Sequence, residues 1–316
     1  VFSSGSQKFG NTADDEHQFT GSLFISGSRI SIDDGDDNIA IGKSTLASIT
    51  PGGAQNVAIG TNAMTNASGV NTDGNVVIGY NAGDAFGGNN VYGTVLIGRN
   101  AGGSINSGDA AGTTAIGYNA GASITSGQYN LAIGYQALVT HTTGDRNIAF
   151  GYGAMDDTDA GSNSLGSDDN MFIGHDAGGG TWVNNTTQRN IGIGNYALDG
   201  ALNAVVSNVA IGYNALTDLN EGDYNIAIGD SAGENITSNV GNVAIGYQSL
   251  QTANSGEDYN VAVGYQSLSG IDNSASDRNI AIGYQTMAGG SDIGYDNIAI
   301  GSTAMLANSA VDYVIA

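Results

Sequence analysis

The chain lacks cysteine and has a single proline in 316 residues. The absence of cysteine excludes disulfides, thiolate metal sites and a cysteine nucleophile. Glycine, in contrast, occurs 51 times, and glycine without proline excludes a collagen triple helix or a proline-rich linker. We interpret this composition as many tight turns between short strands, because glycine adopts backbone angles that other residues avoid.

Basic residues are also scarce, with 7 Lys and Arg against 30 Asp and Glu and a net charge of -23. This balance argues against nucleic-acid binding, which needs a basic surface, and against binding to anionic membranes. No apolar run is long enough to cross a bilayer, so we expect no membrane insertion. Nearly all the acids are aspartate, which is typical of turns.

What the chain does contain is a repeat, Asn-Ile-Ala-Ile-Gly-Tyr-x-Ala-Leu, of which Asn130–Leu138 is a clear copy. There are 15 copies, mostly 17–20 residues apart, with one longer step from Asn147 to Asn170. Threonine replaces the opening asparagine in two copies, and the glycine four residues later is present in all. Representative pairs of this asparagine and glycine are Asn38 and Gly42, Asn130 and Gly134, Asn208 and Gly212, and Asn242 and Gly246.

The repeat predicts a short strand. Ile39 and Ile41 would share one face of it and Ala40 would lie on the other. We expect the two isoleucines, with a following Leu or Met, to form the core. The alanine row then indicates either a narrow roll or a subunit interface, which self-association around a three-fold axis would bury. Glycine would end the strand where a backbone angle or a close contact excludes a Cβ.

A period of about 18 residues is too short for a helical repeat and fits one coil of a parallel β-solenoid. Stacked coils lie about 4.8 Å apart, so fifteen would form a rod of roughly 70 Å. Two structural roles for the asparagines remain open: a side-chain ladder between coils, or closure of the preceding turn.

The repeat resembles the head repeat of YadA-type trimeric autotransporter adhesins, and also repeats in bacteriophage tail-fibre proteins. The segment Phe9–Leu23 looks like parts of phage structural proteins, which favours the phage alternative. The resemblance covers about residues 38–305 and implies a homotrimer of left-handed parallel β-rolls. The period is longer than in the adhesin head, so the loops should protrude more.

We therefore divide the chain into three parts. Residues 1–37 form an N-terminal β connector or cap, because Gln18–Ile32 alternates apolar and small polar residues. Residues 38–305 form the β-solenoid of 15 repeats, and residues 306–316 form a C-terminal strand.

The most irregular copies, within residues 150–198, hold the candidate receptor-binding residues. Trp182 is the only tryptophan and lies in a polar loop, where an exposed ring suits recognition; filling of a local gap is the alternative. His175 takes the place of the tyrosine that follows the repeat glycine in many copies, such as Tyr152. A column of tyrosines at this position could bind carbohydrate by stacking or could be a structural stack.

Aspartates are the candidate metal ligands. Asp33, Asp34, Asp36 and Asp37 are spaced as in calcium loops but lack the later glutamate of an EF-hand, so a solvated turn is the alternative to structural calcium. We expect no other cofactor. Further aspartates precede the repeat asparagines, and the bases placed to relieve their repulsion are Arg146, Arg189 and Arg278.

Catalysis has little support, since the three histidines are scattered and no copy carries an added pair of acids. The sequence predicts a non-enzymatic structural segment of a virion tail fibre whose loops attach to host-surface polysaccharide. The alternatives are a cellular trimeric adhesin or a self-assembling extracellular filament subunit on a cell-surface appendage, and, less favoured, a glycan depolymerase. Each places the protein outside the cell.

Overall fold

The computed structural model describes residues 37–48, 53–68, 72–87, 91–106, 110–158, 166–183, 185–254, 256–271, 276–290, 292–306 and 312–316. The described part contains fifteen strands of three residues, each directly after a repeat asparagine or threonine. They are β1 (Ile39–Ile41), β2 (Val57–Ile59), β3 (Val76–Ile78), β4 (Val95–Ile97), β5 (Thr114–Ile116), β6 (Leu131–Ile133), β7 (Ile148–Phe150), β8 (Met171–Ile173), β9 (Ile191–Ile193), β10 (Val209–Ile211), β11 (Ile226–Ile228), β12 (Val243–Ile245), β13 (Val261–Val263), β14 (Ile280–Ile282) and β15 (Ile298–Ile300).

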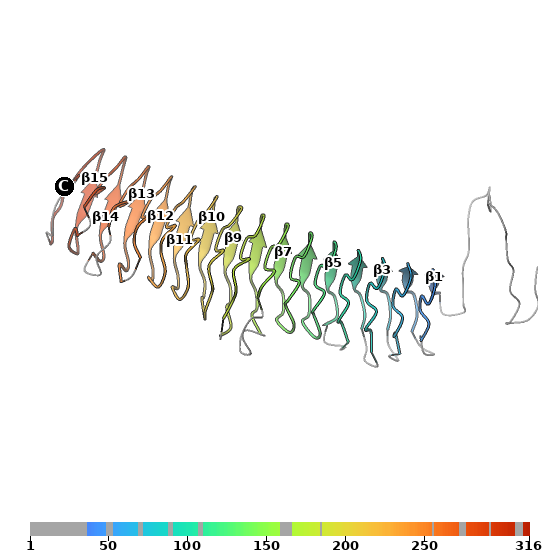
Figure 1. Cartoon of the computed structure of the whole chain (residues 1–316). Helices are drawn as coiled ribbons and strands as arrows, with labels where there is room; N and C mark the ends of the chain where they lie inside the picture. Colours follow the sequence, from blue (N-terminus) through green and yellow to red (C-terminus); the bar gives the residue numbers. More distant parts are fainter. Residues whose placement is uncertain are drawn as a thin grey trace, which may run out of the picture. The chain divides into compact units, whose positions relative to one another are not determined.

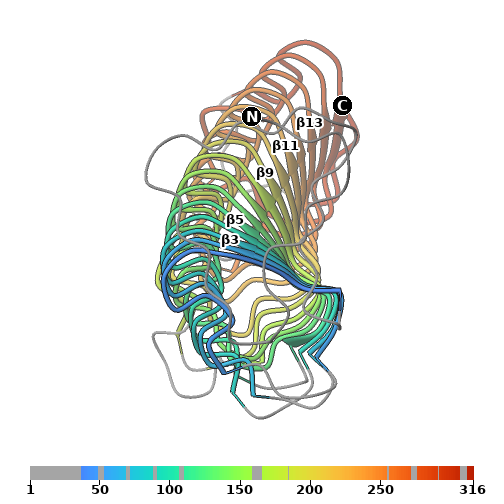
Figure 2. The ribbon, with the colours of Figure 1, turned by 90° about the vertical axis from the view of Figure 1, so that its right-hand side faces the viewer.

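The strands form one parallel sheet in sequence order, from β1 to β15 (Figure 1). Equivalent repeat positions pair, as Ala210 with Ala227, so each repeat is one coil and the predicted parallel β-solenoid is confirmed. We number each coil by its strand; a coil runs from that strand to the next. Successive coils turn relative to one another, so the strand directions fan out along the stack (Figure 2), as the twist of β-sheets requires.

The core lies on the alanine face of the strands. In β2–β15 the central residue is buried, whereas the first and third residues stay partly or largely exposed. In coil 6, for example, Ala132, Ala137 and Leu138 are fully buried together. The prediction that the Ile pair forms the core is therefore wrong. Of the two alternatives for the alanine row, the narrow roll is found, because these alanines are buried within the chain. The central residue is usually alanine; where it is larger, as at Leu96 and Phe172, a glycine of the returning segment lies against it.

Besides the central strand residue, each coil has a second core position after the strand, and it is filled in one of two ways. In most coils a Leu or Met four residues after the repeat glycine is buried, as Leu138 is in coil 6. In coil 3 this position is Gly83, and Phe86 fills the same space, since a Cβ on Gly83 would meet the Phe86 ring at 2.9 Å. Ile105, Ile124 and Ile236 fill the equivalent space beside a glycine in their own coils.

The outer strand face consists of the first and third residues of β1–β15. Most are Ile or Val, and those at the third position include Ile41 at 49% exposed and Ile300 at 61%. This face is a nearly unbroken apolar strip, two residues wide, along the whole sheet.

The two flanking segments are described only in part. Of residues 1–37 only Asp37 lies within the described ranges. Of the predicted C-terminal strand, Ile315 pairs in parallel with Ile298. The Ile298 N–H donates to the Val314 carbonyl (2.8 Å), and the Val314 N–H donates to Asn297 Oδ1 (2.9 Å). Residues 312–316 thus continue the pattern of the coils.

Candidate functional site

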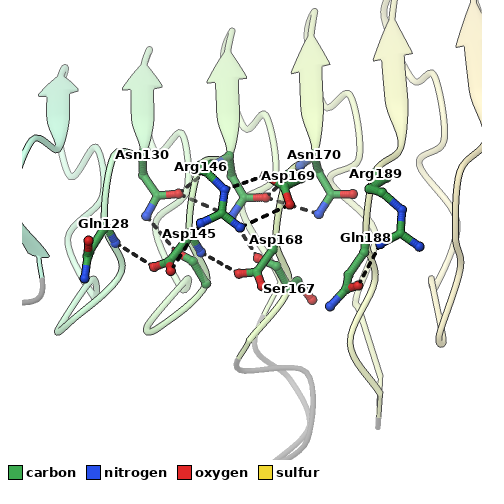
Figure 3. Close-up of polar contacts among 12 residues, drawn as sticks. Gln128, Asn130, Asp145, Arg146, Ser167, Asp168, Asp169, Asn170, Gln188 and Arg189 are labelled. Carbon is green, nitrogen blue, oxygen red and sulfur yellow. Dashed lines mark hydrogen bonds and ion pairs between the residues drawn. The ribbon is translucent and has the colours of Figure 1, made fainter.

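Coils 6–9 combine the constant features of the repeat with its largest irregularities, and the asparagine ladder is the first constant feature (Figure 3). Asn147 donates to Asn130 Oδ1 twice, from its backbone N–H (2.9 Å) and from Nδ2 (3.2 Å). Asn130 Nδ2 also donates to the carbonyl of Gly144 in the turn before Asn147 (2.7 Å). The predicted ladder between coils is therefore confirmed. Closure of the asparagine's own preceding turn is found at Asn190 and Asn208, whose Nδ2 groups also donate to the carbonyls of Gln188 (3.1 Å) and Val206 (3.3 Å).

The glycine that ends each strand is the second constant feature. Gly134 has φ of +142°, and a Cβ there would overlap the carbonyl oxygen of Gly151 in the next coil. Gly42, Gly212 and Gly246 have φ of +138°, +143° and +125° and the same neighbour relationship. Both predicted reasons for glycine, the backbone angle and the close approach, are confirmed.

A third ladder consists of aspartates two residues before the asparagines, and sequence reasoning missed its role. Asp145 Oδ1 accepts the backbone N–H of Gln128 (2.8 Å), and Asp168 Oδ1 accepts that of Asp145 (2.7 Å; Figure 3). The same bond to the preceding coil is made by Asp73, Asp223, Asp258 and Asp277, and also by Asp312, which lies two residues before Val314. The constant offset from the asparagine was the signal that could have revealed it.

Arginine side chains interleave with these carboxylates. Arg146 donates to both carboxylate oxygens of Asp169 (2.6 and 3.1 Å), and this contact lowers the pKa of the Asp169 carboxyl. Arg278 binds Asp296 in the same way (2.8 and 3.3 Å). Arg189 instead contacts Gln188 Oε1 (3.3 Å) and Ser207 Oγ (3.4 Å). The predicted relief of repulsion between the aspartates is thus achieved by a direct ion pair at two of the three arginines, Arg146 and Arg278.

Trp182 is not available for recognition on this chain, because it is fully buried. Its Nε1 donates to the carbonyl of Gly178 (3.0 Å), and its ring meets Phe172 edge-on with centroids 5.8 Å apart. The prediction of an exposed recognition ring is wrong, and the alternative of gap filling is confirmed. Coil 8 has Gly178 where most coils bury Leu or Met; the Phe172 ring occupies the space beside Gly178, and the indole packs against that ring.

Tyr152 and His175 are brought together on the surface. Their rings stack with centroids 4.9 Å apart and planes 8° apart, and Tyr152 stacks in turn on Tyr135 at 5.1 Å. The rings therefore cover one another's faces, which leaves their edges and hydroxyl groups at the surface. A glycan could not stack on the faces between them, so the structural stack is the arrangement found.

Three carboxylates converge beside this stack, from Asp156, Asp176 and Asp199 in coils 7, 8 and 9. A Cβ on Gly179, which lies between them, would be 3.2 Å from Asp156 Oδ1 and 3.1 Å from Asp199 Oδ1. Partial burial, reinforced by repulsion from Asp176, raises the pKa of Asp156 and of Asp199 to about 6. Sequence reasoning missed this carboxylate cluster, because each acid falls in a different repeat.

The calcium prediction is left largely untested. Asp33, Asp34 and Asp36 lie outside the described residues, and Asp37 is exposed with φ of +60°. Within the described ranges no three His, Cys, Asp or Glu side chains are arranged to hold a metal ion. The described part of the chain also has no helix of the length and apolarity needed to span a membrane.

Comparison of this chain with protein-family models, with curated proteins and with solved structures found no match. The resemblance to adhesin heads and tail fibres accordingly stays a prediction from the repeat residues, and the site is defined by its own geometry.

Proposed function

We propose that this protein is a non-enzymatic structural segment of an extracellular fibre, a virion tail fibre in the first instance, built from three copies of the chain. The single observation that carries the proposal is the outer strand face. Its loops would attach the fibre to host-surface polysaccharide.

The outer strand face is too apolar and too long to stay in contact with water. Soluble proteins rarely expose contiguous apolar patches larger than on the order of a few hundred Å². Here Ile226, Ile228, Ile245 and Ile282 are each 37% exposed and Phe150 is 51% exposed. Each belongs to the same two-residue strip.

A second copy of the chain is the occupant that fits this face best. It presents the same two columns of Ile and Val at the same coil spacing, so equivalent coils can pack against one another. The number three and the left-handed sense come from the resemblance of the repeat. Self-association would bury the Ile and Val side chains rather than the alanines.

Coils 6–9 support a scaffold role rather than catalysis. Asp145 and Asp168 are used as acceptors for backbone N–H groups, and Asp169 is bound by Arg146. Recognition by Tyr152 and His175 would use ring edges and the tyrosine hydroxyl, since their faces are covered. A glycan would then be held by hydrogen bonds, with affinity multiplied by three equivalent sites on one fibre.

The mass of the particle in solution tests the proposal, and we expect three chains. Ile228→Asp and Ile245→Asp place charges in the outer strand face and should release monomers. Ser238→Asp adds the same charge to an exposed residue between β11 and β12, away from this face, and should leave the trimer intact.

A stable monomer, or trimers that survive both Ile variants, would overturn the assembly. Concentration-dependent growth of long fibres would favour the filament subunit instead. Release of oligosaccharides from host polysaccharide would overturn the non-enzymatic role.

A further inference from the structure

The tyrosine that follows the repeat glycine forms two runs of stacked rings. Tyr118, Tyr135 and Tyr152 have successive centroid distances of 5.1 and 5.1 Å, with planes 8° and 5° apart. The second run is Tyr247, Tyr265 and Tyr284, with centroids 5.2 and 5.3 Å apart and planes 18° and 11° apart.

These rings are open to solvent. Their exposed fractions run from 37% at Tyr118 to 52% at Tyr152. Cysteine and tryptophan, the other side chains that readily give up a single electron, offer little competition at the surface, because cysteine is absent and the single tryptophan, Trp182, is fully buried. A one-electron oxidant would therefore meet phenol rings first.

We propose that the stacked tyrosines are oxidative modification sites, at which neighbouring coils become joined by dityrosine. The oxidant would be of the peroxide-driven class, such as hydrogen peroxide with a haem peroxidase. This proposal concerns single chains and does not depend on the fibre function.

Each of two tyrosines gives one electron to the oxidant and loses its phenolic proton, which yields two phenoxyl radicals. The radicals join through ring carbons ortho to oxygen, and each coupled carbon then loses its hydrogen as a proton while the oxygen regains one. Two electrons and two protons leave per cross-link, and they reduce one hydrogen peroxide to two waters.

The stack favours coupling within each run over other pairs. Near-parallel rings from in-register coils bring neighbouring phenols face to face, which favours coupling of radicals formed on both. Tyr129 and Tyr259 are more exposed, at 56% and 58%, but their rings lie over the glycines Gly112 and Gly241 of the preceding coils. Accessibility alone would rank these two above the stacked rings, so stacking and exposure predict opposite orders.

Two edge-on pairs separate orientation from distance. Tyr196 and Tyr213 lie 5.8 Å apart with planes at 90°, and Tyr295 and Tyr313 lie 5.5 Å apart at 84°. These centroid distances are close to those of the stacked pairs. If orientation matters, the edge-on pairs should couple less.

The test is brief treatment of the dilute full chain with horseradish peroxidase and hydrogen peroxide, followed by proteolysis and mass spectrometry of cross-linked peptides. We expect dityrosine mainly between Tyr118 and Tyr135, Tyr135 and Tyr152, Tyr247 and Tyr265, and Tyr265 and Tyr284. Tyr135→Phe keeps a ring in the stack but removes the phenol, and should abolish the two links that involve residue 135. Tyr224→Phe changes an exposed tyrosine outside both runs and should leave all four links.

Three results would overturn the proposal, of which the first two come from the folded chain alone. The first is a set of cross-links that follows exposure, with Tyr129, Tyr259 and Tyr313 dominant. The second is coupling mainly between chains, seen as covalent dimers on a denaturing gel. Cross-linking of urea-unfolded chain gives the pattern expected without a stack, and an identical pattern in the folded protein would also contradict it.

Discussion

The ring of Phe172 lies against Gly192 of the next coil, at the strand position where most coils have alanine. The two residues are paired in the sheet, and a Cβ added to Gly192 would meet the Phe172 ring at 2.5 Å. The large residue in β8 is thus accommodated by the missing side chain in β9.

This pair gives the first prediction. Gly192→Ala should destabilise the protein by about 1–3 kcal/mol, because it overpacks the core. Phe172→Ala should cost about 3–5 kcal/mol, because it leaves a cavity next to Trp182. In the double variant the two alanines restore the usual column, so the total loss should be smaller than the sum. Denaturant unfolding of the four proteins measures this coupling, and simple additivity would contradict it.

The terminal glycines provide a second, matched comparison. Gly134→Ala introduces a Cβ that overlaps the next coil, whereas Gly301 has a similar φ of +136° but no atom within 4 Å of an added Cβ. Gly301→Ala should therefore report the backbone strain alone. We expect Gly134→Ala to lower stability far more than the ~1 kcal/mol of an average substitution. Equal shifts in Tm for the two variants would show that close approach is unimportant.

The asparagine ladder gives a third prediction. Asn208 Oδ1 accepts the backbone N–H of Asn225 (2.7 Å), and this group is buried. Asn208→Ala leaves that donor without its acceptor and should cost about 1–3 kcal/mol. The control is Asn185→Ala, which removes an exposed bond to Asn203 (3.0 Å) and should change stability by less than ~0.5 kcal/mol. Chemical unfolding distinguishes the two, and similar losses would argue against the ladder.

The carboxylate cluster of Asp156, Asp176 and Asp199 predicts how stability depends on pH. The folded-state pKa of Asp156 and of Asp199 is raised from 3.8 to about 6, so the fold favours their protonated forms. Their stabilising contribution to the free energy of unfolding is fully present below pH 3.8, and it is lost as the pH rises through about 6. Between these values we expect the free energy of unfolding to fall with rising pH.

Asn substitutions test this dependence. Asp156→Asn and Asp199→Asn should each flatten the pH profile and stabilise the protein near neutral pH. Asp230→Asn removes one charge from an exposed residue outside the cluster, and so corrects for the general repulsion in a chain of net charge -23. If all three variants changed the profile equally, the cluster would have no special role.

The fold was predictable because the features that specify it recur at constant spacing. The asparagine, the three-residue strand and the glycine identify each coil, and the structure confirms both reasons for Gly134 and the ladder role of Asn130. Which face of the strand lies in the core was predicted wrongly. Alternation shows that Ile39 and Ala40 lie on opposite faces of the strand, but it does not show which face is buried. That depends on how closely the chain returns to its own strand.

The candidate site was less predictable because its contacts join residues about one repeat apart. Trp182 looked exposed from its polar neighbours, but its ring is buried against Phe172 and its Nε1 donates to the Gly178 carbonyl. Asp156 and Asp199 are separated by two coils and converge only because Gly179 lies between them. The spacing of residues along the chain does not show which side chains the stacking of coils brings together.

Each strand pairs only with the strands before and after it, so the strand contacts of a coil are with its neighbours in sequence. The free energy of such an array is close to a sum of coil terms and nearest-neighbour terms. Folding can then start at any well-formed coil and spread outward, like a zipper. A damaged coil in the middle, such as one carrying Gly134→Ala, would divide the molecule into two segments that melt separately.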